Sequence, residues 1–286
     1  MELKSNFHDR EWIMDEVKKK YETAVVYFGS EDFVIGAFLV GSQNYNLDIE
    51  SSDIDVKVYV LPSINSIIEN DKPESSTWIQ DDGSHIDYKD FRLVINELEK
   101  GSPNMLETLF TDYYIVNPRY RYLISRLRAY RERIATIDQN RTFNALRGMA
   151  QRFINMYNIN KEGMNSKDLV ALLRIRDFIY SYFILEDNYK KALVSPNISI
   201  LRTLRNNKID LDKLKVFVDE AVNDLDKYEE FFKSKLMNIR SERASLGKAV
   251  LHDILYDLMI SFLKEELRNF EFVSFTDWVK NGEVLI

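Results

Sequence analysis

Residues 33–60 read Phe33-Val-Ile-Gly-Ala-Phe-Leu-Val40, then Gly41-Ser42, ten further residues, and Asp53-Ile-Asp-Val-Lys-Val-Tyr-Val60. The first run is apolar throughout, which is typical of a strand buried on both faces of a sheet. The second run alternates and is rich in β-branched residues, so it predicts a second strand, which Pro62 ends. We therefore expect two neighbouring strands joined through a Gly-Ser turn.

Two carboxylates share one face of the second predicted strand. Side chains two residues apart on a strand point the same way, so Asp53 and Asp55 can meet one cation. Two other Asp-x-Asp triplets with an apolar centre, at 210–212 and 224–226, fall in or beside helical patterns. Residues two apart on a helix diverge by about 200°. We expect the triplet at 210–212 to cap a helix and the one at 224–226 to lie on a wet helix face.

Gly41 and Ser42 directly follow the first predicted strand. A glycine lets the backbone and the Ser42 hydroxyl approach a phosphate closely, and N–H groups of the turn add donors. The simpler alternative is a strand–turn–strand unit in which Gly-Ser only makes the turn.

The flanking sequence indicates an α+β fold with two domains. We predict a helix over 9–22, strands at 77–80 and 85–89, and helices over 91–100 and from Pro103 to Phe110. After Pro118 the pattern changes to long segments of helical period, at 119–133, 138–158, 166–186, 209–235 and 243–267. The predicted domains are 1–117, with the strands, and 118–286, an all-α helical bundle.

Charge is divided unevenly along the 286 residues. Residues 1–117 hold 10 of the 39 Lys and Arg residues and 23 of the 46 Asp and Glu residues. The rest of the chain, 118–286, is therefore net positive. Residues 118–154 contain nine Arg and no Lys. An acidic lobe facing an Arg-rich one suits a metal site beside a polyphosphate or a nucleic acid. A solvated helical surface explains the same charges equally well.

The composition also excludes several classes of protein. The chain has no Cys and three scattered His, so disulfides, thiolate zinc sites and Cys nucleophiles are excluded and a His metal cluster is not expected. The beginning of the chain has no apolar leader, and the longest apolar run is far below the ~20 residues that span a bilayer. We expect a soluble, cytoplasmic protein with no membrane partner. The P-loop motif is absent, and the apolar Ile54 and Val56 exclude an EF-hand.

The motif Gly41-Ser42…Asp53-Ile-Asp55-Val56 resembles the DNA polymerase β superfamily of nucleotidyltransferases in order and spacing. More narrowly, 41–47 and 52–55 are similar to the RNA-ligase-associated branch of predicted nucleotidyltransferases, although Gln43 and Asn46 replace that branch's His and second Gly. The similarity continues through 88–92, 101–107 and the helix that carries Lys167 and Arg174.

This resemblance implies a small mixed β-sheet nucleotidyltransferase core with flanking helices. It implies a metal-dependent enzyme that transfers an NMP from an NTP to an acceptor hydroxyl, with two Mg²⁺ or Mn²⁺ ions per site. Gly41, Ser42, Lys167 and Arg174 would bind the nucleotide, ATP being one candidate. The acceptor, whether RNA or other nucleic acid, a protein or a small molecule, stays open.

Asp53, Asp55 and a third carboxylate would hold the metals and carry the catalysis. Asp87 is the candidate for the third, because it lies on the predicted strand 85–89, where its apolar neighbours Ile86 and Tyr88 face the opposite side of the strand. Asp90 is the alternative, but it has the opposite parity and can instead cap the helix that begins at Phe91.

Two other functions compete with this one. The chain could be a non-catalytic nucleotide- or nucleic-acid-binding regulatory protein on the same fold, with structural carboxylates. It could also bind nucleic acid through the Arg-rich segment 118–154, which the lack of Lys there disfavours. The presence of all three of Asp53, Asp55 and Asp87 favours catalysis.

Overall fold

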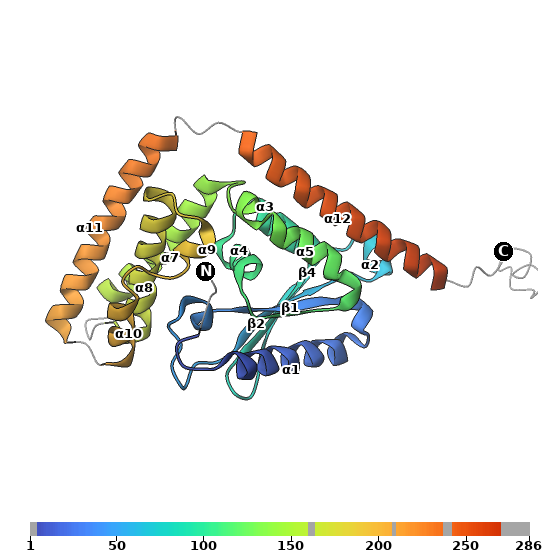
Figure 1. Cartoon of the computed structure of the whole chain (residues 1–286), viewed down its shortest axis with the longest axis horizontal. Coiled ribbons are helices and arrows are strands. Elements are labelled where there is room, and N and C mark those ends of the chain that lie inside the picture. The colour runs from blue at the N-terminus through green and yellow to red at the C-terminus, as the bar shows by residue number, and fades with distance from the viewer. Residues whose placement is uncertain (1–4, 160–163, 208–209, 237–241, 270–286) are drawn as a thin grey trace, which may run out of the picture.

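A five-stranded mixed sheet forms the centre of the molecule (Figure 1). The computed structural model describes residues 5–159, 164–207, 210–236 and 242–269. The strand order is β3-β4-β2-β1-β5, and only β2 and β4 pair in parallel. The strands are β1 (Val34–Val40), β2 (Asp55–Val60), β3 (Ser75–Ile79), β4 (His85–Asp90) and β5 (Tyr114–Val116). The expected α+β class with a mixed sheet is confirmed.

The described helices cover both faces of this sheet and extend to one side of it (Figure 1). Helix α1 (Arg10–Phe28) lies alone against one face, and α7 to α11 form a lobe to one side (Figure 1). Helix α12 returns across α3 and α5. The remaining bounds are α2 (Ile64–Ile68), α3 (Phe91–Glu99), α4 (Pro103–Phe110), α5 (Arg121–Ala129), α6 (Arg131–Ala135), α7 (Gln139–Ile159), α8 (Ser166–Ile179) with a π-helical turn (Tyr180–Ile184), α9 (Tyr189–Ala192), α10 (Ile198–Asn206), α11 (Leu211–Leu236) and α12 (Glu242–Asn269), together with 3₁₀ turns at Glu31–Phe33, Ser42–Tyr45 and Pro118–Tyr120. None of the helices in the described ranges is both long and apolar enough to cross a bilayer.

Alternation along the strands divides the core in two. Val56 and Val58 of β2 pack toward α1, together with Ala37 and Leu39 of β1. Tyr59 belongs to the larger core on the opposite face, under α3 and α4. Since side chains two apart share a face, Asp55 and Lys57 lie on the same face as Tyr59, toward the helices that follow the sheet.

One apolar core crosses the predicted boundary at residue 117. Within the described residues the last strand ends at Val116, so the boundary coincides with the end of the sheet. The larger core nevertheless runs from Phe38 through Leu106 and Leu172 to Phe262. The strands and the helices beyond residue 117 are therefore packed into one body.

Most predicted elements are present with ends shifted by a few residues. The strand predicted over 53–60 begins at Asp55, which leaves Asp53 in the preceding loop. Helix α10 was not predicted, because it is short and lies between two breaks in the pattern. Asp210 accepts a hydrogen bond from the N–H of Asp212 at the start of α11, so the expected cap is confirmed.

The Arg-rich segment 118–154 largely fastens helices to their neighbours. Arg126 pairs with Asp253 and Asp257 of α12, and Arg147 pairs with Asp226 and Glu229 of α11. Others lie against aromatic rings, such as Arg128 at 4.1 Å from the centre of the Tyr114 ring. These contacts within the chain give Arg126, Arg128 and Arg147 a structural role, and nucleic-acid binding by the segment stays a hypothesis.

The first prediction concerns Asp90, the alternative third carboxylate. Its side chain accepts from the N–H of Arg92 at 2.8 Å, which caps α3, and it also pairs with the Arg92 guanidinium at 2.7 Å. Asp90→Ala should therefore lower the free energy of unfolding by about 2 kcal/mol, measured by urea denaturation. Asp90→Asn keeps the cap and should lose clearly less. Equal losses in the two variants would contradict the capping role.

Candidate functional site

The Gly-Ser turn and the paired carboxylates meet at one end of the sheet. Val40 and Asp55 are opposite each other in the antiparallel pairing of β1 with β2. The side-chain amide of Gln43 donates to the backbone oxygen of Asp53 at 2.9 Å. Asp53 is exposed, and the Asp55 side chain is 36% exposed. Both carboxylates are thus open to solvent beside Gly41 and Ser42.

A buried glutamate organises the turn. Glu107 of α4 is only 4% exposed, and its Oε1 accepts from the N–H of Gly41 at 2.7 Å and from Nδ2 of Asn44 at 2.8 Å. Its Oε2 accepts from the Tyr45 hydroxyl. Gly41 has φ 101°, a conformation that favours glycine. Burial, together with the Glu107 charge, raises the pKa of Tyr45 well above its ordinary value, so that the phenol remains a donor.

Three arginines reach the turn and carboxylates from the helical lobe. The Arg174 guanidinium of α8 lies 3.8 Å from the centre of the Tyr45 ring. Arg202 of α10 donates to the backbone oxygen of Asn46 at 3.1 Å and to its side-chain oxygen. Burial lowers the pKa of Arg205, while the nearby negative charges of Asp53 and Asp168 oppose that effect. Positive charge from α8 and α10 therefore lies against the turn, and the charge of Arg205 interacts with that of Asp53.

The other predicted nucleotide-binding residues are placed differently. Ser42 is partly buried in the turn, with its hydroxyl 3.4 Å from Oε1 of Gln43. Lys167 is exposed in the first turn of α8, seven residues before Arg174. Of the predicted cations, the structure places Arg174 against the Gly-Ser turn.

Asp87 is not grouped with the other two carboxylates. It stands opposite Lys57 in the parallel pairing of β2 with β4, forms an ion pair with it, and accepts from Oγ1 of Thr77 at 3.2 Å. His85 instead lies beside Asp55, with its N–H donating at 2.8 Å and its Nδ1 at 3.4 Å from the same oxygen. Over the described residues, no group of three or more His, Asp or Glu is placed to hold a metal. The register of β4 against β2 places His85, and not Asp87, beside Asp55.

Four residues of the site were not predicted from the sequence. Gln43 and Glu107 lie inside the quoted motifs, and no pattern indicated a contact for Gln43. Arg202 and Arg205 lie on the unpredicted α10. Only Glu107 left a signal, since a lone acid in the apolar stretch Met105–Phe110 predicts a buried, hydrogen-bonded carboxylate.

Comparison with known proteins gives little beyond this geometry. No family model matches the chain, and no curated protein does. Among solved structures, a nucleotidyltransferase-like protein from Exiguobacterium sibiricum 255-15 is similar over 89% of this chain and 80% of its own, with 10% sequence identity and a TM-score of 0.31. At that level the likeness carries no argument about function, so any functional argument has to come from the site itself.

The second prediction concerns Glu107. Its replacement by Ala would remove the acceptor of the Gly41 N–H and the Tyr45 hydroxyl and one of the two acceptors of the Asn44 amide, which should lower the free energy of unfolding by about 3 kcal/mol. Glu107→Gln keeps one acceptor oxygen and should lose less. Urea denaturation of both variants measures this. A Glu107→Ala variant as stable as the native protein would mean that the turn does not depend on this carboxylate.

Proposed function

We propose that the chain is a nucleotidyltransferase that moves an NMP from an NTP to an acceptor hydroxyl. The observation that carries the proposal is the convergence of Asp53, Asp55 and the Gly41-Ser42 turn at one sheet end, opposite Arg174 and Arg205. This is the combination that a triphosphate with its metal requires: anionic ligands for the cation and cations for the phosphates. The assignment to the RNA-ligase-associated branch rests on the sequence motifs alone.

The carboxylates suit a cation that arrives with the nucleotide. Mg²⁺ is commonly held by one or two carboxylates plus the phosphates of its substrate. Asp53 and Asp55 supply two exposed sets of hard oxygen ligands, and neither forms an ion pair with Lys or Arg among the described contacts. When bound, Mg²⁺ or Mn²⁺ would lower the pKa of the attacking hydroxyl and offset charge on the phosphates.

The side chains of this chain would then divide the remaining work. The hydroxyl of Ser42 would donate to a phosphate oxygen. Arg174 and Arg205, with Lys167 nearer the solvent, would stabilise the negative charge of the departing pyrophosphate. The bonds of Glu107 to the turn would hold Ser42 in place, which lowers the cost of ordering the site when the nucleotide binds.

The third prediction tests the two carboxylates. Asp53→Asn and Asp55→Asn should each reduce NMP transfer by orders of magnitude, because each removes a charged metal ligand, while the melting temperature changes little. The assay is incubation with each α-labelled NTP, Mg²⁺ or Mn²⁺, and a cell extract that supplies acceptors, followed by detection of the labelled product.

Asp210→Asn is the matched control. Asp210 is also an exposed member of an acid–apolar–acid triplet, but it caps α11, where Asn serves equally well. Transfer should be unaffected in this variant. If Asp53→Asn and Asp210→Asn behaved alike, the metal assignment would be wrong.

The fourth prediction concerns Asp87, which stays our candidate for the third carboxylate. To join Asp53 and Asp55 it has to exchange its ion pair with Lys57 for a metal. If it does so during turnover, Asp87→Ala should slow the single-turnover rate by orders of magnitude while NTP affinity is nearly preserved. Lys57→Met separates the two roles, because it frees Asp87 without removing it. If the single-turnover rate were normal in Asp87→Ala but reduced in Lys57→Met, the ion pair would have a structural role and Asp87 would not be the third carboxylate.

A non-catalytic nucleotide binder is the second candidate, and the Asp87–Lys57 ion pair is what favours it. On this alternative the protein binds NTPs through the arginines and the turn but transfers nothing. NTP binding with no labelled product under any metal or acceptor would select it.

A further inference from the structure

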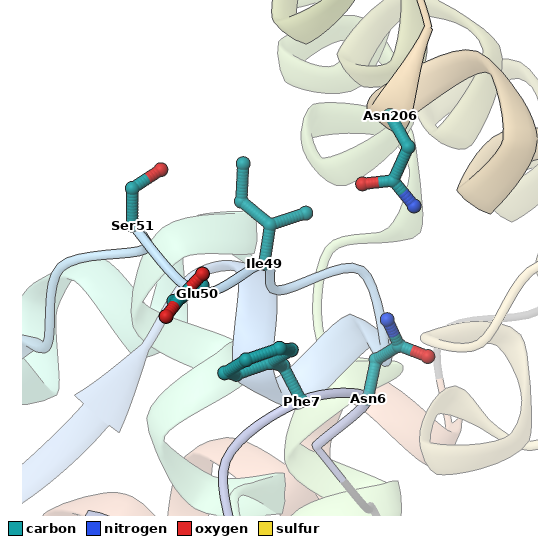
Figure 2. Close-up of a pocket in the computed structure, with 6 residues that line it drawn as sticks. All are labelled: Asn6, Phe7, Ile49, Glu50, Ser51 and Asn206. Atoms are coloured by element: carbon teal, nitrogen blue, oxygen red, sulfur yellow. The ribbon is translucent and has the colours of Figure 1, made fainter.

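A pocket of ≈ 540 Å³ opens beside the proposed site (Figure 2). Three segments that are distant in the sequence build it: the N-terminal stretch, the loop before Asp53 and the end of α10. Its lining residues are Asn6, Phe7, Ile49, Glu50, Ser51 and Asn206. Ser51 lies two residues before Asp53 and Asn206 follows Arg205 in the chain, so the pocket adjoins the carboxylates and the cation that face each other there.

The N-terminal wall of the pocket is fixed by a buried carboxylate. Asp48 is fully buried and accepts from the Ser5 hydroxyl at 2.6 Å and from the N–H groups of Asn6, Phe7 and His8 at 2.5, 3.0 and 3.2 Å. Burial alone would raise the pKa of Asp48, but these hydrogen bonds outweigh it and lower the pKa. An ionised acceptor with several donors holds the backbone of residues 5–8 in one conformation.

Phe7 is exposed although its backbone is fixed. Its side chain is 56% exposed, with the ring edge-on to His8, which in turn stacks on Trp12 at 4.1 Å. Figure 2 shows Phe7 and Ile49 near the centre of the view, with Asn6 and Asn206 on the right and Glu50 and Ser51 on the left. A held, exposed ring bordered by amides offers a stacking surface together with hydrogen-bond donors and acceptors.

The lining identifies the kind of ligand. It contains no Lys or Arg, and Glu50 adds a negative charge, so a phosphate is not the group that fits. A planar ring with an apolar face and a polar edge matches one aromatic platform beside two amides, because Asn can both donate to and accept from a base edge. The volume, within the range of small-molecule pockets, leaves ample room for such a ring.

We propose that this pocket binds a nucleobase, which stacks on Phe7 and meets Asn206 with its polar edge. The inference rests on the proposed function, since it adds a base subsite to the same reaction centre. The base would belong either to the NTP or to the nucleotide at the end of a nucleic-acid acceptor, and the two share one chemistry of recognition.

Titration calorimetry on the full chain with Mg²⁺ tests the subsite with three probes: an NTP, tripolyphosphate, which has no base, and a short oligoribonucleotide. Phe7→Ala should weaken binding of a base-containing probe by about tenfold, the effect of losing one base–aromatic stack. Tripolyphosphate affinity should not change. Phe7→Tyr should restore binding, and Asn206→Ala should weaken it too. Tyr256→Ala, which removes an equally exposed ring from α12, is the control and should have no effect.

Weaker NTP binding assigns the pocket to the base of the donor, and weaker oligoribonucleotide binding alone assigns it to the acceptor. Unchanged affinity for both, or an equal loss with tripolyphosphate, would overturn the proposal. These titrations need no turnover. A failure to detect NMP transfer would therefore count against the proposed function, whereas the base subsite stands or falls on whether Phe7→Ala weakens binding of either base-containing probe more than binding of tripolyphosphate.

Discussion

The candidate site depends on the hydrogen bonds that the buried carboxylate of Glu107 accepts from the turn. Removing a charge from water is costly unless hydrogen bonds compensate, and here the donors of Gly41, Asn44 and Tyr45 do so. Those bonds attach the turn after β1 to α4, a helix in the core shared by the sheet and the helical lobe. Arg174 on the Tyr45 ring then connects the same turn to α8. The anchored turn is thereby joined both to α4 and to the helical lobe.

Local patterns in the sequence were sufficient for the elements that carry the carboxylates. The apolar run 33–40 and the alternating run 53–60 predicted β1 and β2 within two residues, and Asp90 caps α3 as one alternative expected. Such patterns do not determine the register of β4 against β2. Shifting β4 by two residues against β2 would keep every side chain on its face and would place Asp87, not His85, beside Asp55. The alternation of side chains therefore predicted the face of the sheet on which Asp87 lies. It could not predict that Lys57 would be the residue opposite Asp87 on β2.

The uneven charge left two interpretations of the Arg-rich segment 118–154 open, while the predicted nucleotide-binding cations, Lys167 and Arg174, lie outside that segment. The sequence drew attention to 118–154, yet arginines there mostly pair with acids of α11 and α12 or lie on rings. The arginines that reach the Gly-Ser turn and Asp53 are Arg174, Arg202 and Arg205. Which cation faces a site depends on how helices pack, a long-range property, whereas a cluster in sequence reflects only local composition.

Two buried carboxylates hold the loop that carries the site. Glu107 binds its first part, 41–45, and Asp48, within the loop, binds residues 5–8. Hydrogen bonds from backbone N–H, amide and hydroxyl groups compensate the charge of each carboxylate. Neither carboxylate forms an ion pair with an arginine among the described contacts. Asp87 is likewise neutralised locally, by Lys57. Asp53 and Asp55 form no ion pair with Lys or Arg among the described contacts, and the charge of Arg205 interacts with that of Asp53. Two carboxylates that are open to solvent, one in the loop and one at the start of β2, can offer oxygen ligands to a cation, which is what the proposed metal that arrives with its nucleotide requires.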